Sequence, residues 1–147
     1  LGITKNEYKH LFAQNTLPCG IDEVVSFKGR LSHVETITSI SKADYHIFIR
    51  NSNKLNMAGF PTKYVESISC GTPVLTNSML NIEKYFIPGQ TGYILDTSSQ
   101  ENLKKSLFKA CNVGKDKIIN MKKYCKDFKG FNYSNYIDYV DSFMKNI

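Results

Sequence analysis

The residues best suited to chemistry lie in the loop and predicted helix at residues 50–66. Residues 50–62 form a long, polar segment that follows an apolar run and ends in Gly-Phe-Pro-Thr. A helix is predicted to begin there, with either Pro61 in its first position or Thr62 as its N-cap. Either start leaves backbone amides free beside Lys63. Because the first turn of a helix also carries the positive end of its dipole, this pattern favours an anion, most naturally a phosphate group.

Glu66 lies one turn further into the same predicted helix. Its carboxylate can accept hydrogen bonds from a pair of sugar hydroxyl groups, which would complement an anion site. An ordinary strand–loop–helix unit with a solvent-exposed glutamate explains the same pattern. Both interpretations remain open on these residues alone.

Capping boxes and short apolar runs predict the elements that position this loop. The capping boxes are Thr4-x-x-Glu7, Ser32-x-x-Glu35 and Ser98-x-x-Glu101, and each predicts the start of a helix. The predicted strands lie near residues 24–28, 45–49, 73–76 and 92–95. Strands that alternate with helices in this way predict a doubly wound α/β fold, in which a parallel sheet has right-handed helical crossovers.

The length of 147 residues fits a single domain, which we expect to span residues 1–147. A doubly wound sheet normally opens with a strand, so we expect the first strand to be missing or reduced to residues 1–3. The sequence begins with Leu1 rather than Met, so we expect it to be part of a longer protein. Apolar stripes predict helices over residues 103–111 and 118–125, and a longer stripe predicts a last helix over about 132–146.

Charge and composition narrow the function further. The net charge is +6, and residues 101–130 hold nine lysines against three acidic residues. These lysines alternate with apolar residues at helical spacing, so a solvated helix face is one interpretation, and a surface for anionic lipid or nucleic acid is another. No window approaches the ~18 uninterrupted apolar residues of a transmembrane helix.

Cysteine and histidine spacing indicates no metal site. The four cysteines, Cys19, Cys70, Cys111 and Cys125, contain no C-x-x-C pair and match no zinc pattern, so we expect reduced and mostly buried thiols. His46 lies within an apolar run, where we expect an imidazole with a structural hydrogen bond rather than a ligand.

Residues 59–74, which read GFPTKYVESISCGTPV, resemble the donor-binding segment of glycosyltransferase family 4. Members of this family are retaining enzymes of the GT-B fold. Three other segments resemble the family in the same order: residues 25–29, which precede its base-binding loop, residues 43–49, one of its strands, and residues 89–95, its G-x-x-G-x-hydrophobic piece. The ordered combination covers roughly residues 20–110 and is more specific than any single piece.

The resemblance implies roles for six residues. Glu66 matches the glutamate that binds the donor ribose, and Arg30 and Leu31 match the loop whose backbone faces the nucleobase. Phe60, Thr62 and Lys63 match the turn that approaches the diphosphate and the sugar. The resemblance assigns no catalytic residue here, and the family needs neither a metal nor a further cofactor.

The implied function is that of the C-terminal, donor-binding domain of a glycosyltransferase of the hexosyltransferase type. The donor would be a UDP- or GDP-linked sugar, and the acceptor a polysaccharide or a glycolipid. The partner would be an N-terminal acceptor domain that is missing here, so we expect this chain alone to be inactive. We expect a cytoplasmic protein that binds no nucleic acid, with peripheral contact at the inner face of the plasma membrane through the full-length protein.

Two departures from the family pattern keep a second hypothesis open. Ala58 stands where the first of the family's two glutamates falls, although the P-T-K-x-x-E variant, typical of capsule and surface polysaccharide synthesis, is closer to this chain. The family's phosphate-binding Arg and Lys would lie before the first residue. The alternative is a non-catalytic module that binds a nucleotide or phosphate.

Overall fold

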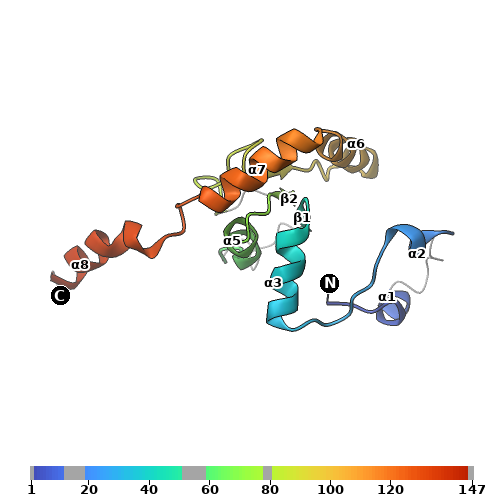
Figure 1. The fold of residues 1–147 in the computed structure, drawn as a ribbon, viewed down its shortest axis with the longest axis horizontal. Helices are drawn as coiled ribbons and strands as arrows, with labels where there is room; N and C mark the ends of the chain where they lie inside the picture. The colour runs from blue at the N-terminus through green and yellow to red at the C-terminus, as the bar shows by residue number, and fades with distance from the viewer. Residues whose placement is uncertain (1, 12–18, 51–58, 78–80, 146–147) are drawn as a thin grey trace. The chain divides into compact units, whose positions relative to one another are not determined.

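The computed structural model describes residues 2–11, 19–50, 59–77 and 81–145. They form an α/β fold in two compact units, Leu1–Ser39 and Ile40–Ile147, each of which is described by itself. The elements, all labelled in Figure 1 except β3 and η1, are α1 (Lys5–Leu11), α2 (Ile21–Val24), α3 (His33–Lys42), β1 (His46–Phe48), α5 (Thr62–Ser69), β2 (Val74–Thr76), β3 (Gly92–Ile94), α6 (Gln100–Cys111), α7 (Lys115–Asp127), the 3₁₀ helix η1 (Tyr133–Tyr136) and α8 (Ile137–Lys145). That the whole chain is a single domain stays a prediction.

The three strands form one parallel sheet in the order β1-β2-β3. His46 pairs with Val74 across the first ladder, and Val74 pairs with Gly92 across the second. The parallel sheet and the strands expected near residues 45–49, 73–76 and 92–95 are confirmed, although each strand is shorter than its apolar run.

Both faces of the central strand β2 are covered, as its apolar run predicts, whereas Ile47 of β1 is 50% exposed. Neighbouring residues of a strand point to opposite faces, and Val74 and Leu75 accordingly belong to separate clusters. Val74 packs with residues of β1, α5 and α7, namely Phe48, Tyr64, Ile68 and Cys125. Leu75 packs with Leu95 and with the α6 residues Leu103, Leu107 and Ala110. The sheet therefore has α5 and α7 on one face and α6 on the other.

The strand expected near residues 24–28 is wrong. Val24 is the last residue of α2, and residues 25–28 form neither helix nor strand. Val25 is extended, and its N–H donates to Ile21 O of α2 at 2.8 Å rather than to a neighbouring strand. Just after the run, Gly2 N donates to Gly29 O at 2.7 Å, and Gly29 N to Ile3 O at 3.1 Å. A β-branched run becomes a strand only where a neighbouring strand pairs with it, and Val24, 84% exposed, is not buried as a core strand would be.

The first two capping boxes form as expected. Thr4 N donates to Glu7 Oε2 at 2.7 Å, and Glu7 N donates back to Thr4 Oγ1 at 3.2 Å. Ser32 and Glu35 repeat the exchange at 2.9 and 3.3 Å. These two reciprocal pairs begin α1 and α3.

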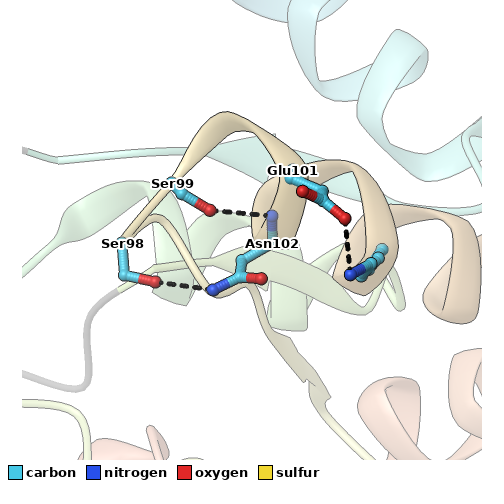
Figure 2. Close-up of polar contacts among 5 residues, drawn as sticks. Ser98, Ser99, Glu101 and Asn102 are labelled. Carbon is cyan, nitrogen blue, oxygen red and sulfur yellow. Dashed lines mark hydrogen bonds and ion pairs between the residues drawn. The ribbon is translucent and has the colours of Figure 1, made fainter.

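The third capping box is wrong by one residue (Figure 2). The N-cap of α6 is Ser99, whose Oγ accepts from Asn102 N at 3.1 Å. Ser98 accepts from the Asn102 side-chain amide instead, while its own N–H and O–H donate to Asp96 Oδ1 at 2.9 and 2.5 Å. Glu101 faces Lys105 at 2.7 Å rather than the helix start. The turn made by Asp96 holds Ser98 outside the helix.

The shifted cap predicts a measurable difference between two adjacent serines. Ser99→Ala is expected to lower the free energy of unfolding by about 1 kcal/mol, because a free amide of α6 loses its acceptor. Ser98→Ala is expected to cost less, because the exposed side chains that it contacts can bind water. Urea denaturation of both variants measures the difference. A larger loss from Ser98→Ala would contradict the cap at Ser99.

Within the larger unit, backbone hydrogen bonds end α5, and a lysine of α7 binds the segment before β1. Gly71, with φ +72°, ends α5: its N–H donates to Ile68 O and that of Thr72 to Ser67 O, both at 2.9 Å. This is a Schellman motif, whose left-handed residue is most often glycine. Lys122 of α7 donates to the carbonyl oxygens of Ser41 and Ala43, next to the end of α3.

The closing helices follow their predicted stripes. Ala110, Met121 and Cys125 are buried, whereas the lysines of residues 101–130 other than Lys122 are exposed, as the solvated-face interpretation expects. The expected last helix is divided: η1 comes first, with Asn132 Oδ1 accepting from Ser134 N at 3.0 Å, and α8 follows. The apolar stripe of α8 is exposed along the described residues.

Candidate functional site

The predicted site is built on the first turn of α5, which starts after β1 and its loop. Pro61 is the N-cap residue, with φ −75° and ψ 95°, and Thr62 is the first helical residue. Both expected starts are therefore displaced by one residue. Proline offers no side-chain acceptor, so the N-cap residue itself does not cap this helix, and Tyr64 N donates to Pro61 O at 2.9 Å; among the residues that the structure describes, no other partner is recorded for the amides of Thr62 and Lys63. The start of α5 thus keeps the free amides that an anion site needs.

The structure brings three of the predicted residues together on one face of α5. Thr62, Lys63 and Glu66 are exposed, and helical spacing of three and four residues places them on adjacent turns of the same face. Tyr64 and Ile68, on the opposite face, are buried against the sheet. The burial of Tyr64 raises its pKa to about 12, so its hydroxyl stays protonated and donates to Tyr85 O at 2.9 Å. The exposed face combines one cation, one anion and one hydroxyl group above a rigid buried face.

The ring of Phe60 packs against two other aromatic rings, and its role at the donor site stays a prediction. Its ring packs edge-on against Tyr85 at 5.7 Å and Phe131 at 6.2 Å between ring centroids. Tyr85 and Phe131 are themselves 5.0 Å apart, and the ring of Phe60 remains 40% exposed. Phe60 therefore anchors the start of α5 to the segment that follows α7. Sequence analysis missed Tyr85 and Phe131, since no local pattern links them to residue 60.

His46 supports α5 from β1. Its Nδ1 is hydrogen-bonded to Ser67 Oγ, and Ser67 donates its own proton to Lys63 O at 2.7 Å, so Nδ1 is the donor toward Ser67. Burial lowers the pKa of His46, the Lys63 charge adds to this effect, and the Glu66 charge opposes it. The expectation of a structural imidazole agrees with this hydrogen bond.

Arg30 and Leu31 belong to the other compact unit, Leu1–Ser39. Arg30 is exposed and Leu31 is half-buried, immediately before the Ser32 cap of α3. Their role in facing a nucleobase stays a prediction. Ala58, the position of the family's first glutamate, lies outside the described residues.

Metal ligands and membrane helices do not occur among the described residues. Within residues 2–11, 19–50, 59–77 and 81–145, no group of three or more His, Cys, Asp or Glu could hold a metal ion. No helix in these ranges is long and apolar enough to cross a membrane. The four cysteines are free, but the expectation of mostly buried thiols is wrong: Cys125 is buried, Cys70 is half-buried, and Cys19 and Cys111 are exposed because they lie on outward faces.

Comparison with known proteins gives one match. The family described as "Glycosyl transferases group 1" matches residues 2–128, a range that includes every predicted site residue. No curated protein and no solved structure matches the chain.

Proposed function

This chain belongs to the group 1 glycosyl transferases, and we propose that the exposed face at the start of its helix α5 binds the nucleotide-sugar donor. The chain is a glycosyltransferase domain, and enzymes of this group transfer a sugar from a nucleotide sugar. The three-stranded parallel sheet and its helices agree with one Rossmann-like half of a GT-B enzyme, the C-terminal, donor-binding half.

The observation that carries the proposal is the uncapped start of α5 beside an exposed lysine. Within the described part of the chain, no side chain is recorded on the amides of the first turn, and the proline ring of Pro61 fixes φ at the N-cap. A diphosphate placed there accepts hydrogen bonds from these amides, while the helix dipole and Lys63 attract its charge. Thr62 adds a hydroxyl group at the same turn.

Glu66 completes the donor site in this proposal. It is exposed one turn beyond the amides, so a nucleotide whose diphosphate binds the first turn can present its ribose hydroxyls to the carboxylate. Arg30 and Leu31 would face the base through their backbone, as the resemblance implies. Phe60 belongs to the turn that approaches the diphosphate and the sugar; its ring packs on Tyr85 and Phe131 and is 40% exposed.

We also propose the finer features of the reaction. Transfer proceeds with retention from a UDP- or GDP-linked sugar to a polysaccharide or glycolipid acceptor, and needs no metal or further cofactor. The acceptor is held by an N-terminal domain. The full-length protein works in the cytoplasm, in peripheral contact with the inner face of the plasma membrane, where such acceptors are assembled.

A second candidate function is a module that binds a nucleotide or phosphate without catalysis. Ala58 in place of the family's first glutamate favours it, since an alanine side chain cannot hydrogen-bond a donor sugar. Transfer by the full-length protein separates the two functions: a donor that binds and is never consumed in the presence of acceptor would support the second.

Nucleotide binding without transfer is the expected behaviour of the 147-residue chain. UDP or GDP, and the corresponding sugar nucleotides, are expected to raise its melting temperature, because a ligand at a hundred times its Kd stabilises the folded state by about 2.7 kcal/mol. A thermal-shift panel of UDP, GDP and ADP measures this, with ribose and inorganic phosphate as controls. A panel in which no nucleotide shifts the transition would contradict the donor site.

The same preparation is expected to transfer no sugar. In a two-domain cleft, closure excludes water and aligns the acceptor with the donor. One domain alone cannot close around the two substrates. A labelled sugar nucleotide incubated with the chain and acceptor tests the point. Donor-dependent glycosyl transfer by this chain would contradict the need for a second domain.

A further inference from the structure

We propose that Asn77 is a positioning residue for the donor site, because its side chain joins the carboxyl ends of the three strands. Asn77 directly follows β2 and is half-buried. Its Oδ1 accepts from Arg50 N at 2.9 Å, and its Nδ2 donates to Arg50 O at 2.9 Å. Arg50 lies two residues beyond the end of β1. This inference rests on the proposed donor-binding function.

The two bonds to Arg50 extend the sheet by one step. The last paired residues of β1 and β2 are Phe48 and Thr76, and beyond them the Asn77 amide engages the N–H and the C=O of Arg50 together. A backbone N–H only donates and a carbonyl only accepts, so both ends of the amide are assigned by their partners. Asparagine fits this position because it carries one acceptor and one donor in the same plane; aspartate offers acceptors only.

A third bond reaches the segment after β3. Asn77 Nδ2 also donates to Thr97 Oγ1 at 3.3 Å. One side chain therefore contacts the chain beyond each of the three parallel strands. In open α/β sheets the carboxyl ends of the strands form the edge at which ligands bind, and α5 starts from this edge. Loss of the Asn77 amide would let the strand ends separate and shift this edge relative to the first turn of α5.

Asn77→Ala in the 147-residue chain tests the inference. We expect a folded variant whose Arg50 amide exchanges with solvent faster than in the parent, and whose affinity for UDP or GDP, whichever stabilises the parent, falls on the order of tenfold. Exchange is followed by NMR and affinity by calorimetry. Asn77→Asp, which keeps the shape but leaves Arg50 O facing an acceptor, is expected to change both quantities in the same direction.

Two matched variants separate positioning from stability. Thr97→Val removes only the 3.3 Å bond and is expected to lower affinity less than Asn77→Ala does, because both bonds to Arg50 remain. Thr72→Val removes the buried bond from Thr72 Oγ1 to Ile40 O, at 2.8 Å, near the opposite end of β2. It is expected to lower the melting temperature without changing nucleotide affinity.

The possible results are distinguishable. Nucleotide binding by the parent with equal affinity in Asn77→Ala would overturn the positioning role while leaving the proposed function intact. Unchanged exchange at Arg50 would overturn it as well. A parent that binds no nucleotide would overturn the proposed function itself. An affinity loss in Thr72→Val as large as that in Asn77→Ala would reduce Asn77 to a general contribution to stability.

Discussion

Gly92→Ala is expected to lower the melting temperature of the sheet-containing unit by more than about 10 °C. A Cβ atom at Gly92 would lie 1.9 Å from the carbonyl oxygen of Val74 and 2.9 Å from its nitrogen. Both are backbone atoms of β2, which is buried and paired on both sides, so they cannot move aside without breaking a ladder. Thermal unfolding followed by circular dichroism measures the change.

Gly89→Ala is the matched control for this variant. Gly89 lies in the same turn, and its N–H donates to Gly92 O at 2.9 Å. Its φ of +76° is left-handed and costs alanine about 1 kcal/mol, less than the φ of +153° at Gly92, a conformation that is essentially confined to glycine. Nothing lies within 4 Å of the Cβ that alanine would add at Gly89, so this variant measures left-handed strain without a collision. Melting temperatures of the two variants within a few degrees of each other would show that β2 and β3 separate at low cost.

The strands of the sheet could be predicted from the sequence because their patterns are local. The run at residues 73–76 is buried along its whole length, which is typical of strands covered on both faces, whereas Ile47 and Ile49 of the run at residues 45–49 are 50% and 48% exposed. The run at residues 24–28 is also rich in β-branched and aromatic residues, but Val24 ends α2 and residues 25–28 form no strand. Pairing requires a neighbouring strand, which the composition of the run itself does not reveal.

The cap of α6 shows the same limit over a shorter distance. Ser98 and Ser99 are both good N-cap residues, and the glutamate three positions after Ser98 favoured the first. The Asp96 side chain decided the outcome by accepting from the N–H and O–H of Ser98. An aspartate two residues before the serine is a visible signal for a turn, and it could have been weighed against the capping box.

Some residues of the predicted site are related by local helical spacing, whereas others have contacts far away along the chain. The sequence correctly predicted a helix that begins at residues 61–62, and the spacing of three and four residues places Thr62, Lys63 and Glu66 on one exposed face of it. The partners of Phe60 lie 25 and 71 residues further along the chain, and those of Asn77 lie 27 residues before it and 20 after it. Such contacts depend on the sheet order and on α7, so local spacing could not predict them.

The Glu66 carboxylate is the anionic group of the proposed donor site, and its contribution to nucleotide affinity depends on which ligand groups it binds. It lies one turn from the uncapped amides of α5 and is exposed, so a ligand can reach it. If two ribose hydroxyls donate to it, both bonds are assisted by its charge, and such bonds contribute on the order of 1.5–3 kcal/mol. A solvated glutamate would contribute nothing to nucleotide affinity.

Glu66→Gln is therefore expected to weaken nucleotide binding roughly ten- to a hundredfold, because the amide keeps the shape but loses the charge. Calorimetry with the nucleotide that stabilises the parent gives the ratio of the two Kd values. Glu101→Gln serves as the control: Glu101 is also an exposed helical glutamate, and its ion pair with Lys105 at 2.7 Å adds little stability at the surface. It should bind as the parent does. Equal affinity of Glu66→Gln and the parent would show that Glu66 is an ordinary solvent-exposed residue. The donor contacts of this helix would then be limited to the amides of its first turn, Thr62 and Lys63.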